Sequence, residues 1–253
     1  MRDQQDRAKS TDLNAPLMAG SIDVEAHGPN TRGRRKRFRI GHGPWLAVAA
    51  LVFLSLVMVS VPGARRSILR AIGRQLVVEQ AAVKSADIIV LAVDADGQGT
   101  LEVADLVHRG VSNRVAVFDD YPSKVDLEFL RRGVPHEDSA AVAARQLHSL
   151  GVQNVEKIPR STSGSEQEGE ILPGWCDAQN YHSVVLVTSS DHSRRLGRIL
   201  RRSVRGRSLE ITVEASPYSE FDPNTWWETR GGTREGIVEL EKLLLDFARH
   251  PFS

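Results

Sequence analysis

The sequence predicts an α/β fold, a parallel sheet with helices on both faces, preceded by one transmembrane helix. The first observation behind this prediction is an uncharged apolar run over residues 45–61. The second is the alternation, from residue 86 onward, of short apolar runs with amphipathic stretches, which is typical of parallel strands joined by helices. The third is the composition, 41% hydrophobic and 26% charged over 253 residues, which allows one domain with a sizeable core.

The N-terminal segment, residues 1–44, predicts a disordered basic tail on the cytoplasmic side of a membrane, because its small and polar residues show no apolar periodicity. The net charge of +1 divides into +4 over residues 1–44 and −3 over residues 65–253. A folded part with negative net charge is not typical of nucleic-acid binding, so we expect no nucleic-acid partner. A block of basic residues ends the tail: Arg32, Arg34, Arg35, Lys36, Arg37 and Arg39.

The apolar run predicts a transmembrane signal anchor over residues 45–62. As a helix the run would be about 25 Å long, close to the roughly 30 Å hydrocarbon core, with Trp45 at one interface. More basic residues precede the run than follow it, which keeps the N-terminus cytoplasmic and places the C-terminal domain outside the cytoplasm. A cleaved signal peptide is the alternative, disfavoured by the length of the run and by Pro62 close to the only suitable cleavage site. We therefore expect a single-pass protein of the plasma (inner) membrane, with the lipid bilayer as a partner.

Residues 63–85 predict a juxtamembrane linker, and residues 86–253 a folded domain. The first strand, residues 88–93, is apolar throughout and bounded by Asp87 and Asp94, as expected for a strand buried on both faces. Four more strands are predicted over residues 115–118, 155–158, 183–187 and 209–213, the last with the alternation of an edge strand. Helices are predicted over residues 101–108, 127–131, 139–150, 166–179, 194–205 and 236–248.

Three local features refine these helices. Ser139 is expected to cap the helix over residues 139–150. Pro173, followed by Gly174, is expected to break or kink the helix over residues 166–179. The helix over residues 194–205 carries a series of arginines on a face that we expect to be solvated. These are Arg194, Arg198, Arg201 and Arg205.

Polar side chains follow the strands at their carboxyl ends, where ligands bind in open parallel sheets. The strongest group follows the fourth strand, where hydroxyls at a helix N-terminus, an imidazole and two guanidinium groups suit an anion such as phosphate or carboxylate. His192 and Glu166 are the predicted acid–base pair. The predicted ligand-binding residues are Asp94, Thr162, Ser165, Thr188, Ser189, Arg194 and Arg195. The alternative is that Ser190 or Asp191 only caps the helix while the arginines face water.

A metal site is not predicted. The stretch from Asp94 to Asp105 has the spacing of an EF-hand loop, but a strand precedes it and the last position holds Asp instead of Glu. The single cysteine, Cys176, excludes an intramolecular disulfide and a zinc site built on several thiolates. Motifs of nucleotide hydrolases, dinucleotide oxidoreductases, serine esterases of the Gly-x-Ser-x-Gly type and zinc proteases are absent from the sequence. The sequence indicates no particular cofactor.

Three segments, in order, resemble the SanA/YdcF/ElyC-like family. Residues 183–195, with Val187-Thr188-Ser189 followed by His192 and Arg195, are similar to the family's strand ending in Val-Thr-Ser before His and Arg. The segment Arg160-Ser161-Thr162 with Glu166, and the stretch from Trp226-Trp227 to Lys242, resemble two further family segments. The resemblance implies a membrane-anchored Rossmann-like domain with a role in envelope biogenesis and the barrier function of the cell surface.

The first strand differs from the family pattern, because Val93-Asp94-Ala95-Asp96-Gly97 stands where the family has a Gly-rich turn followed by Arg. This difference predicts either a ligand of another size or a loss of activity. The leading hypothesis is a membrane-anchored extracytoplasmic domain that binds a small anionic, phosphate-bearing envelope precursor, with hydrolase or transferase chemistry as the enzymatic version. The alternatives are a noncatalytic scaffold that recruits peptidoglycan or lipid-carrier enzymes, and a cytoplasm-facing small-molecule transferase.

Overall fold

The structure is a computed structural model that describes residues 43–78 and 83–252. Most of the predicted tail, residues 1–42, therefore lies outside the described residues. The described part of the chain divides into two units between Val48 and Ala49.

Two helices precede the sheet. Helix α1 spans Gly43–Ser60, and α2 spans Pro62–Arg74, with Pro62 at a position where its missing N–H costs no hydrogen bond. Among the helices of the described residues, none has both the length and the apolarity that crossing a membrane requires. Helix α2 occupies much of the segment predicted as a linker.

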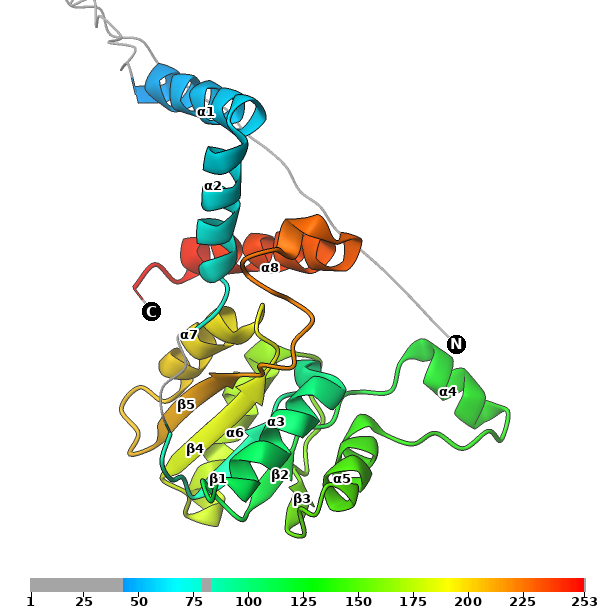
Figure 1. Cartoon of the computed structure of the whole chain (residues 1–253). Helices are drawn as coiled ribbons and strands as arrows, with labels where there is room; N and C mark the ends of the chain where they lie inside the picture. The colour runs from blue at the N-terminus through cyan, green and yellow to red at the C-terminus, as the bar shows by residue number, and fades with distance from the viewer. Residues whose placement is uncertain (1–42, 79–82, 253) are drawn as a thin grey trace, which may run out of the picture. The chain divides into compact units, whose positions relative to one another are not determined.

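The domain is built on a parallel sheet of 5 strands in the order β3-β2-β1-β4-β5 (Figure 1). The strands are β1 (Ile88–Leu91), β2 (Val115–Val117), β3 (Val155–Lys157), β4 (Ser183–Thr188) and β5 (Glu210–Ala215). All neighbouring strands pair in parallel, which confirms the predicted α/β fold with a parallel sheet. The predicted edge position of the last strand is also confirmed.

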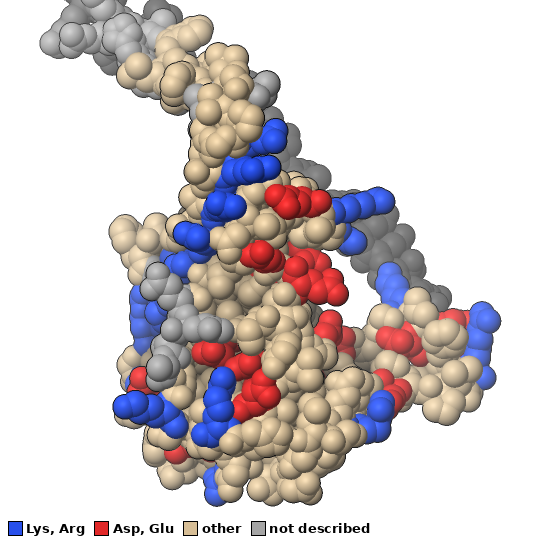
Figure 2. Space-filling model, in the orientation of Figure 1, with Lys and Arg blue, Asp and Glu red and all other residues tan. Residues whose placement is uncertain are grey.

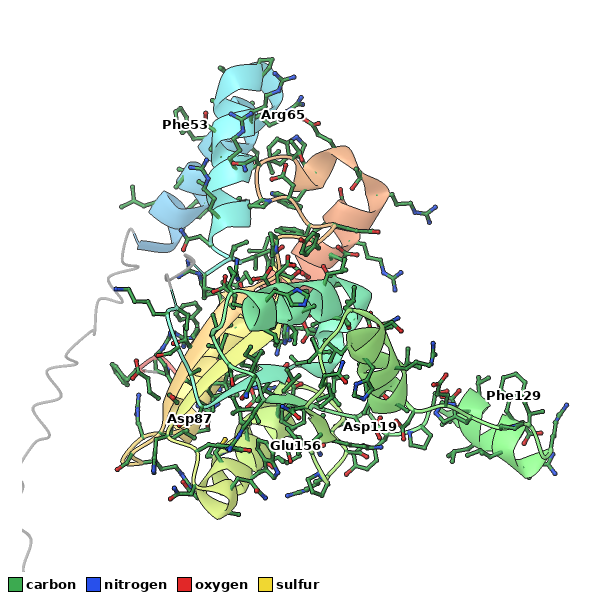
Figure 3. All side chains as sticks on the ribbon, turned by 60° about the horizontal axis from the view of Figure 1, so that its bottom comes forward. Phe53, Arg65, Asp87, Asp119, Phe129 and Glu156 are labelled. Atoms are coloured by element: carbon green, nitrogen blue, oxygen red, sulfur yellow. The ribbon has the colours of Figure 1, made fainter. Side chains whose placement is uncertain are left out.

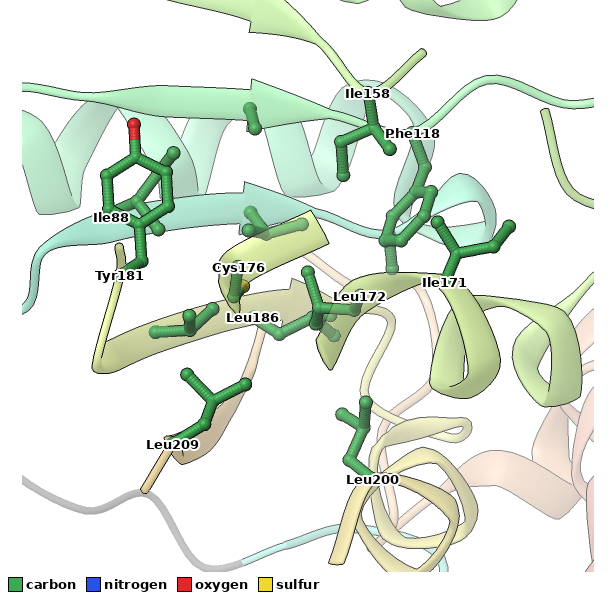
Figure 4. Close-up of a cluster of buried hydrophobic side chains, with 14 of the residues drawn as sticks. Ile88, Phe118, Ile158, Ile171, Leu172, Cys176, Tyr181, Leu186, Leu200 and Leu209 are labelled. Atoms are coloured by element: carbon green, nitrogen blue, oxygen red, sulfur yellow. The ribbon is translucent and has the colours of Figure 1, made fainter. Parts of the chain in front are cut away.

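Helices cover both faces of the sheet. Alternate residues of each strand point to opposite faces, so Ile88 and Val90 join one core while Ile89 and Leu91 join the other. On the first face, α6 (Ser165–Gln179) and α7 (Ser193–Ser203) supply side chains such as Leu172, as Figure 4 shows. On the second face the cover comes from α3 (Asp96–His108) and α5 (Ser139–Ser149).

Helices α6 and α5 show two local differences from the predictions. Helix α6 runs without interruption through Pro173, because burial of Leu172 and Cys176 offsets the lost hydrogen bond. The cap of α5 is Asp138 instead of Ser139, since the Asp138 carboxylate accepts from the N–H of Ala141 at 2.7 Å.

Helix α4 (Lys124–Arg131) buries none of its residues. Ser123 begins it with a capping box in which Ser123 and Asp126 exchange side-chain and backbone hydrogen bonds. Its Phe129, labelled in Figure 3, lies away from the sheet and is 48% exposed. The apolar side chains of α4 therefore add nothing to the core.

Helix α8 (Arg230–Arg249) is held to α7 by ion pairs at matched spacing. On α7, Arg195, Arg198 and Arg202 lie three and four residues apart; on α8, the acidic partners Glu239 and Asp246 lie seven apart. Arg198 Nε donates to Asp246 at 2.6 Å, and the guanidinium stacks over the ring of Phe247. The prediction that the arginine face is solvated is therefore wrong for Arg198, which is buried.

Trp226, in the short helix η2 (Trp226–Glu228), joins α2 to α8. Its indole N–H donates to the carbonyl of Leu69 at 2.9 Å. Glycines on both helices make room for the ring, since an added Cβ at Gly73 or Gly236 would lie 2.7 or 2.6 Å from indole carbons. The indole also stacks on Phe221. Burial of one large side chain thus fixes α2 against the domain.

We expect Trp226→Ala to lower the free energy of unfolding by about 3–5 kcal/mol, because the cavity left between two glycine-bearing helices cannot collapse. Trp227→Ala is the matched control. Because the Trp227 ring is more exposed, its loss should lower the free energy of unfolding by only about 1 kcal/mol. Urea unfolding of the full chain in detergent, followed by circular dichroism, measures both. Equal losses in the two variants would contradict this account of the contact.

Candidate functional site

The site lies at the carboxyl ends of β1 and β4, the central strands, from which the chain continues to opposite sides of the sheet. This is the position at which doubly wound sheets bind ligands. The loop after β1 places Asp94 there, and Asp94 accepts from Thr188 Oγ1 at 2.9 Å and from Ser189 Oγ at 2.8 Å. The ends of the two strands are thus joined by a carboxylate.

A cavity of about 1020 Å³ opens at this edge, large enough for a small organic molecule. Six of the residues predicted from the sequence line it: Asp94, Ser165, Glu166, Ser189, His192 and Arg195. They come from three segments that are distant in the sequence. The prediction of a site at the carboxyl ends of the strands thus agrees with the position of the cavity.

Three side chains in the cavity wall form a hydrogen-bonded chain. Ser165 Oγ lies 2.7 Å from His192 Nε2, and His192 Nδ1 lies 3.1 Å from Glu239 Oε2. All three residues are buried, with the imidazole 7% exposed. A hydroxyl, an imidazole and a carboxylate in this order can move a proton from the hydroxyl to the ring.

Glu239 is the most heavily bonded group of the site. Besides facing His192, it accepts from Arg195 Nε at 2.9 Å and from Lys242 Nζ at 2.6 Å. Burial works against the ionised form, but the bonds from His192, Arg195 and Lys242 outweigh it and hold the pKa of Glu239 well below its usual range. Glu239 is therefore a fixed negative charge.

That charge acts on the imidazole. Burial would lower the pKa of His192, but the carboxylates of Asp94 and Glu239 outweigh burial and raise it. Arg195 opposes them, with Nη2 at 2.8 Å from Nδ1 and 3.5 Å from Nε2. His192 Nδ1 therefore lies between a donor, Arg195, and an acceptor, Glu239, and it bonds the carboxylate when it carries the proton.

Local backbone structure sets these side chains in place. Gly164 precedes α6 with φ of 139°, a conformation that side-chain-bearing residues rarely adopt, and so turns the chain directly into the helix. Ser165 is consequently the first residue of α6. His192 lies at the N-cap position of α7 and Arg195 one turn further along, so both reach the same cavity.

Glu168 adds a second carboxylate beside Asp94. It lies one turn after Ser165 on the buried side of α6, and its carboxylate accepts from the N–H of Val93 at 2.8 Å. Burial and the nearby negative charge of Asp94 raise the pKa of Glu168 to about 7. Near neutral pH the site therefore contains a carboxyl group that can release or take up a proton.

Negative charge dominates the cavity. Several acidic side chains gather in the middle of the face that Figure 2 shows. Among the described lining residues only Arg195 and Lys242 are Lys or Arg, and both bond Glu239. Eight lining residues are acidic: Asp94, Asp96, Glu166, Glu168, Asp191, Glu220, Glu235 and Glu239. Such a wall attracts cations and repels anions.

Three predicted ligand-binding residues do not line the cavity, although they support it. Arg194 turns away and donates to the carbonyl of Val77 at 2.8 Å. Thr162 is fully buried and bonds the N–H and carbonyl of Gly164, shaping the turn before α6. Thr188 is buried and holds Asp94. Their roles are structural because their polar groups are used within the protein.

The predicted partner of His192 needs correction. Glu166 lines the cavity, but its side chain is 64% exposed and lies 3.5 Å from Arg202. The carboxylate in contact with the imidazole belongs to Glu239. Glu166 and Ser165 are adjacent on α6 and point in different directions, which explains the difference.

Sequence reasoning missed Glu239, Lys242 and Glu168 as site residues. A signal for Glu168 was present, because it precedes the core residues Ile171 and Leu172 by three and four positions and so belongs to the buried face of α6. Glu239 gives no such signal, since its place beside His192 depends on how α8 packs on α7.

Comparisons with known proteins assign no function to the site. No protein-family model matches the chain, and no curated protein is found to be similar to it. Within the part of the chain that the structure describes, no cluster of three or more His, Cys, Asp or Glu side chains is arranged to hold a metal ion. The site is therefore interpreted from its own geometry.

We expect the pKa of His192 to lie above the ordinary value of 6.5. The substitution Glu239→Gln should lower the pKa of His192. Loss of the Glu239 charge removes a group that stabilises the imidazolium and leaves the Arg195 charge unopposed. NMR titration of the imidazole measures both values. Glu241→Gln, an exposed change on the same helix, is the control and should leave the pKa unchanged. A His192 that titrates identically in wild type and Glu239→Gln would contradict the assigned contact.

Proposed function

We propose that this chain is a membrane-anchored enzyme of the cell envelope that acts on a small ligand in the cavity, with His192 as the group that transfers protons. The observation that carries the proposal is the buried His192 held between Ser165 and Glu239 in the wall of the cavity. A purely structural histidine needs neither a cavity of about 1020 Å³ nor a carboxyl group that titrates near pH 7 beside it.

We propose a neutral or cationic ligand. The expected phosphate-bearing ligand would bring negative charge into a wall that already holds eight acidic side chains. The acidic side chains of the wall already repel one another. Burial and neighbouring carboxylates together raise the pKa values of Asp96 and Glu235. To bind an anion, Arg195 would have to give up its ion pair with Glu239. The buried Glu239 carboxylate would then lose its Arg195 partner.

The envelope role and the anchor rest on the sequence. Support for the envelope comes from the resemblance to the SanA/YdcF/ElyC-like family over residues 160–166, 183–195 and 226–242. Support for an anchor comes from the apolar residues 45–61, from the basic block before them and from the exposure of described α1 side chains such as Leu51, Phe53 and Leu56. The proposed orientation puts the enzymatic domain outside the cytoplasm.

We expect His192→Ala to abolish rescue of envelope integrity in cells that lack the protein, because the proton-transfer group is removed. Sensitivity of the cells to a detergent measures the rescue. His182→Ala is the matched control, since His182 is an exposed histidine that does not line the cavity. If a folded His192→Ala protein rescues as well as wild type, the chain acts as a noncatalytic scaffold and the proposed enzyme is wrong.

The anchor predicts that deletion of residues 43–61 moves the protein from the membrane fraction to the supernatant after an alkaline carbonate wash. Alkaline phosphatase fused after Ser253 is expected to be active in intact cells, because alkaline phosphatase becomes active only outside the cytoplasm. Membrane retention of the deletion variant would refute the anchor. An inactive but stable fusion would favour the cytoplasm-facing alternative.

A further inference from the structure

We infer that Ser165 is a catalytic nucleophile and that the substrate is a carboxylic ester, cleaved through an acyl-enzyme by Ser165, His192 and Glu239. This inference rests on the proposed function of the same site and adds the substrate class and the reaction. It is carried by the hydrogen-bonded order of hydroxyl, imidazole and carboxylate, with distances of 2.7 and 3.1 Å, at a wall that a ligand can reach.

The hydrogen-bonding capacity of Ser165 fits this role. A hydroxyl has one hydrogen to donate and two lone pairs. Arg195 Nη1 is a donor with no acceptor capacity, and it lies 3.2 Å from Ser165 Oγ. The Ser165 hydrogen is thus free to point at His192 Nε2 in the tautomer whose Nδ1–H is directed to Glu239. The proposed mechanism uses the neutral tautomer with the proton on Nδ1, in which Nε2 accepts the Ser165 proton.

Positive groups lie where negative charge would develop. Arg195 Nη1 stabilises charge on Ser165 Oγ, and the first turn of α6 adds N–H groups of Ser165 and Glu166 that have no acceptor within the helix. Gly164 leaves the approach open, because an added Cβ there would meet none of the described atoms within 4 Å. Backbone N–H groups beside an open approach suit the oxygen of a carbonyl under attack.

The negative charge of the cavity favours a neutral carboxylic ester over a phosphate ester as the substrate. A phosphate ester carries its negative charge before the reaction begins, and the acidic wall repels it. A carboxylic ester is neutral, and a single negative charge forms only in the transition state, beside Arg195. A neutral or cationic alcohol portion fits the remaining wall of Asp191, Glu220 and Glu235.

The reaction is balanced with water as the co-reactant. Ser165 Oγ forms a bond to the carbonyl carbon while its proton passes to His192 Nε2. The bond from that carbon to the alkoxy oxygen then breaks, and the Nε2 proton leaves with the alcohol. Water attacks the acyl-enzyme, gives one proton to Nε2 and forms the acid as the Ser165 ester bond breaks. That proton returns to Ser165 Oγ.

A fluorophosphonate probe tests the nucleophile, because it reacts covalently with an activated serine. Full-length protein in detergent is treated with the probe, digested and analysed by mass spectrometry. We expect one phosphonyl group on Ser165 in wild type and none at that position in Ser165→Ala. Ser208→Ala, which removes an exposed hydroxyl outside the cavity wall, is the matched control and should be labelled like wild type. His192→Ala should slow the labelling by about 100-fold or more.

A kinetic measurement complements the label. 4-Nitrophenyl acetate, a neutral ester, should give a burst of nitrophenol equal to the protein concentration, followed by slower turnover. An absence of label on wild-type Ser165, or unchanged labelling in folded His192→Ala, would overturn the nucleophile. If Ser165→Ala still rescues the envelope while His192→Ala does not, the ester chemistry is wrong and the proposed enzyme stands. If His192→Ala also rescues, the proposed function itself fails.

Discussion

The ionic contact between α7 and α8 is the constraint on which the site depends. Glu239 is buried and ionised, and it is stable only while Arg195, His192 and Lys242 surround it. Removal of one member of such a group leaves an uncompensated buried charge, which costs about 3–5 kcal/mol. The same contact orients the imidazole toward Ser165. One interaction therefore joins two helices and positions the imidazole at the cavity.

The topology explains why three distant segments meet there. In the order β3-β2-β1-β4-β5 the connections from β1 and β4 leave on opposite sides, which opens a crevice between their carboxyl ends. Asp94 spans that crevice by accepting from the hydroxyls of Thr188 and Ser189. The first turn of α6 and the side of α8 that carries Glu239 supply the walls. The scaffold thus fixes the loops whose polar groups face the cavity.

The strands and the residues directly after them could be predicted because their signals are local. The run from Ile88 to Leu91 is apolar over its whole length, and His192 and Arg195 follow β4 closely in the sequence. The start of α3 at Asp96 was missed because glycines there lower helix propensity, whereas tertiary packing requires Gly99 beside Leu91. Glu239 lies 47 residues after His192, and no periodicity indicates which face of α8 meets α7.

Protonation in the site belongs to the group of side chains and not to one residue. Glu168 with a pKa of about 7 lies under the influence of Asp94 and His192, and the Asp94 carboxylate also raises the pKa of His192. When Glu168 loses its proton, the negative charge around the imidazole increases, and this raises the pKa of His192 further. The protonation of Glu168 and the protonation of His192 are therefore coupled. Because the neutral imidazole is the form that accepts a proton from Ser165, the acidic side chains that attract a cationic ligand also disfavour the basic form of His192.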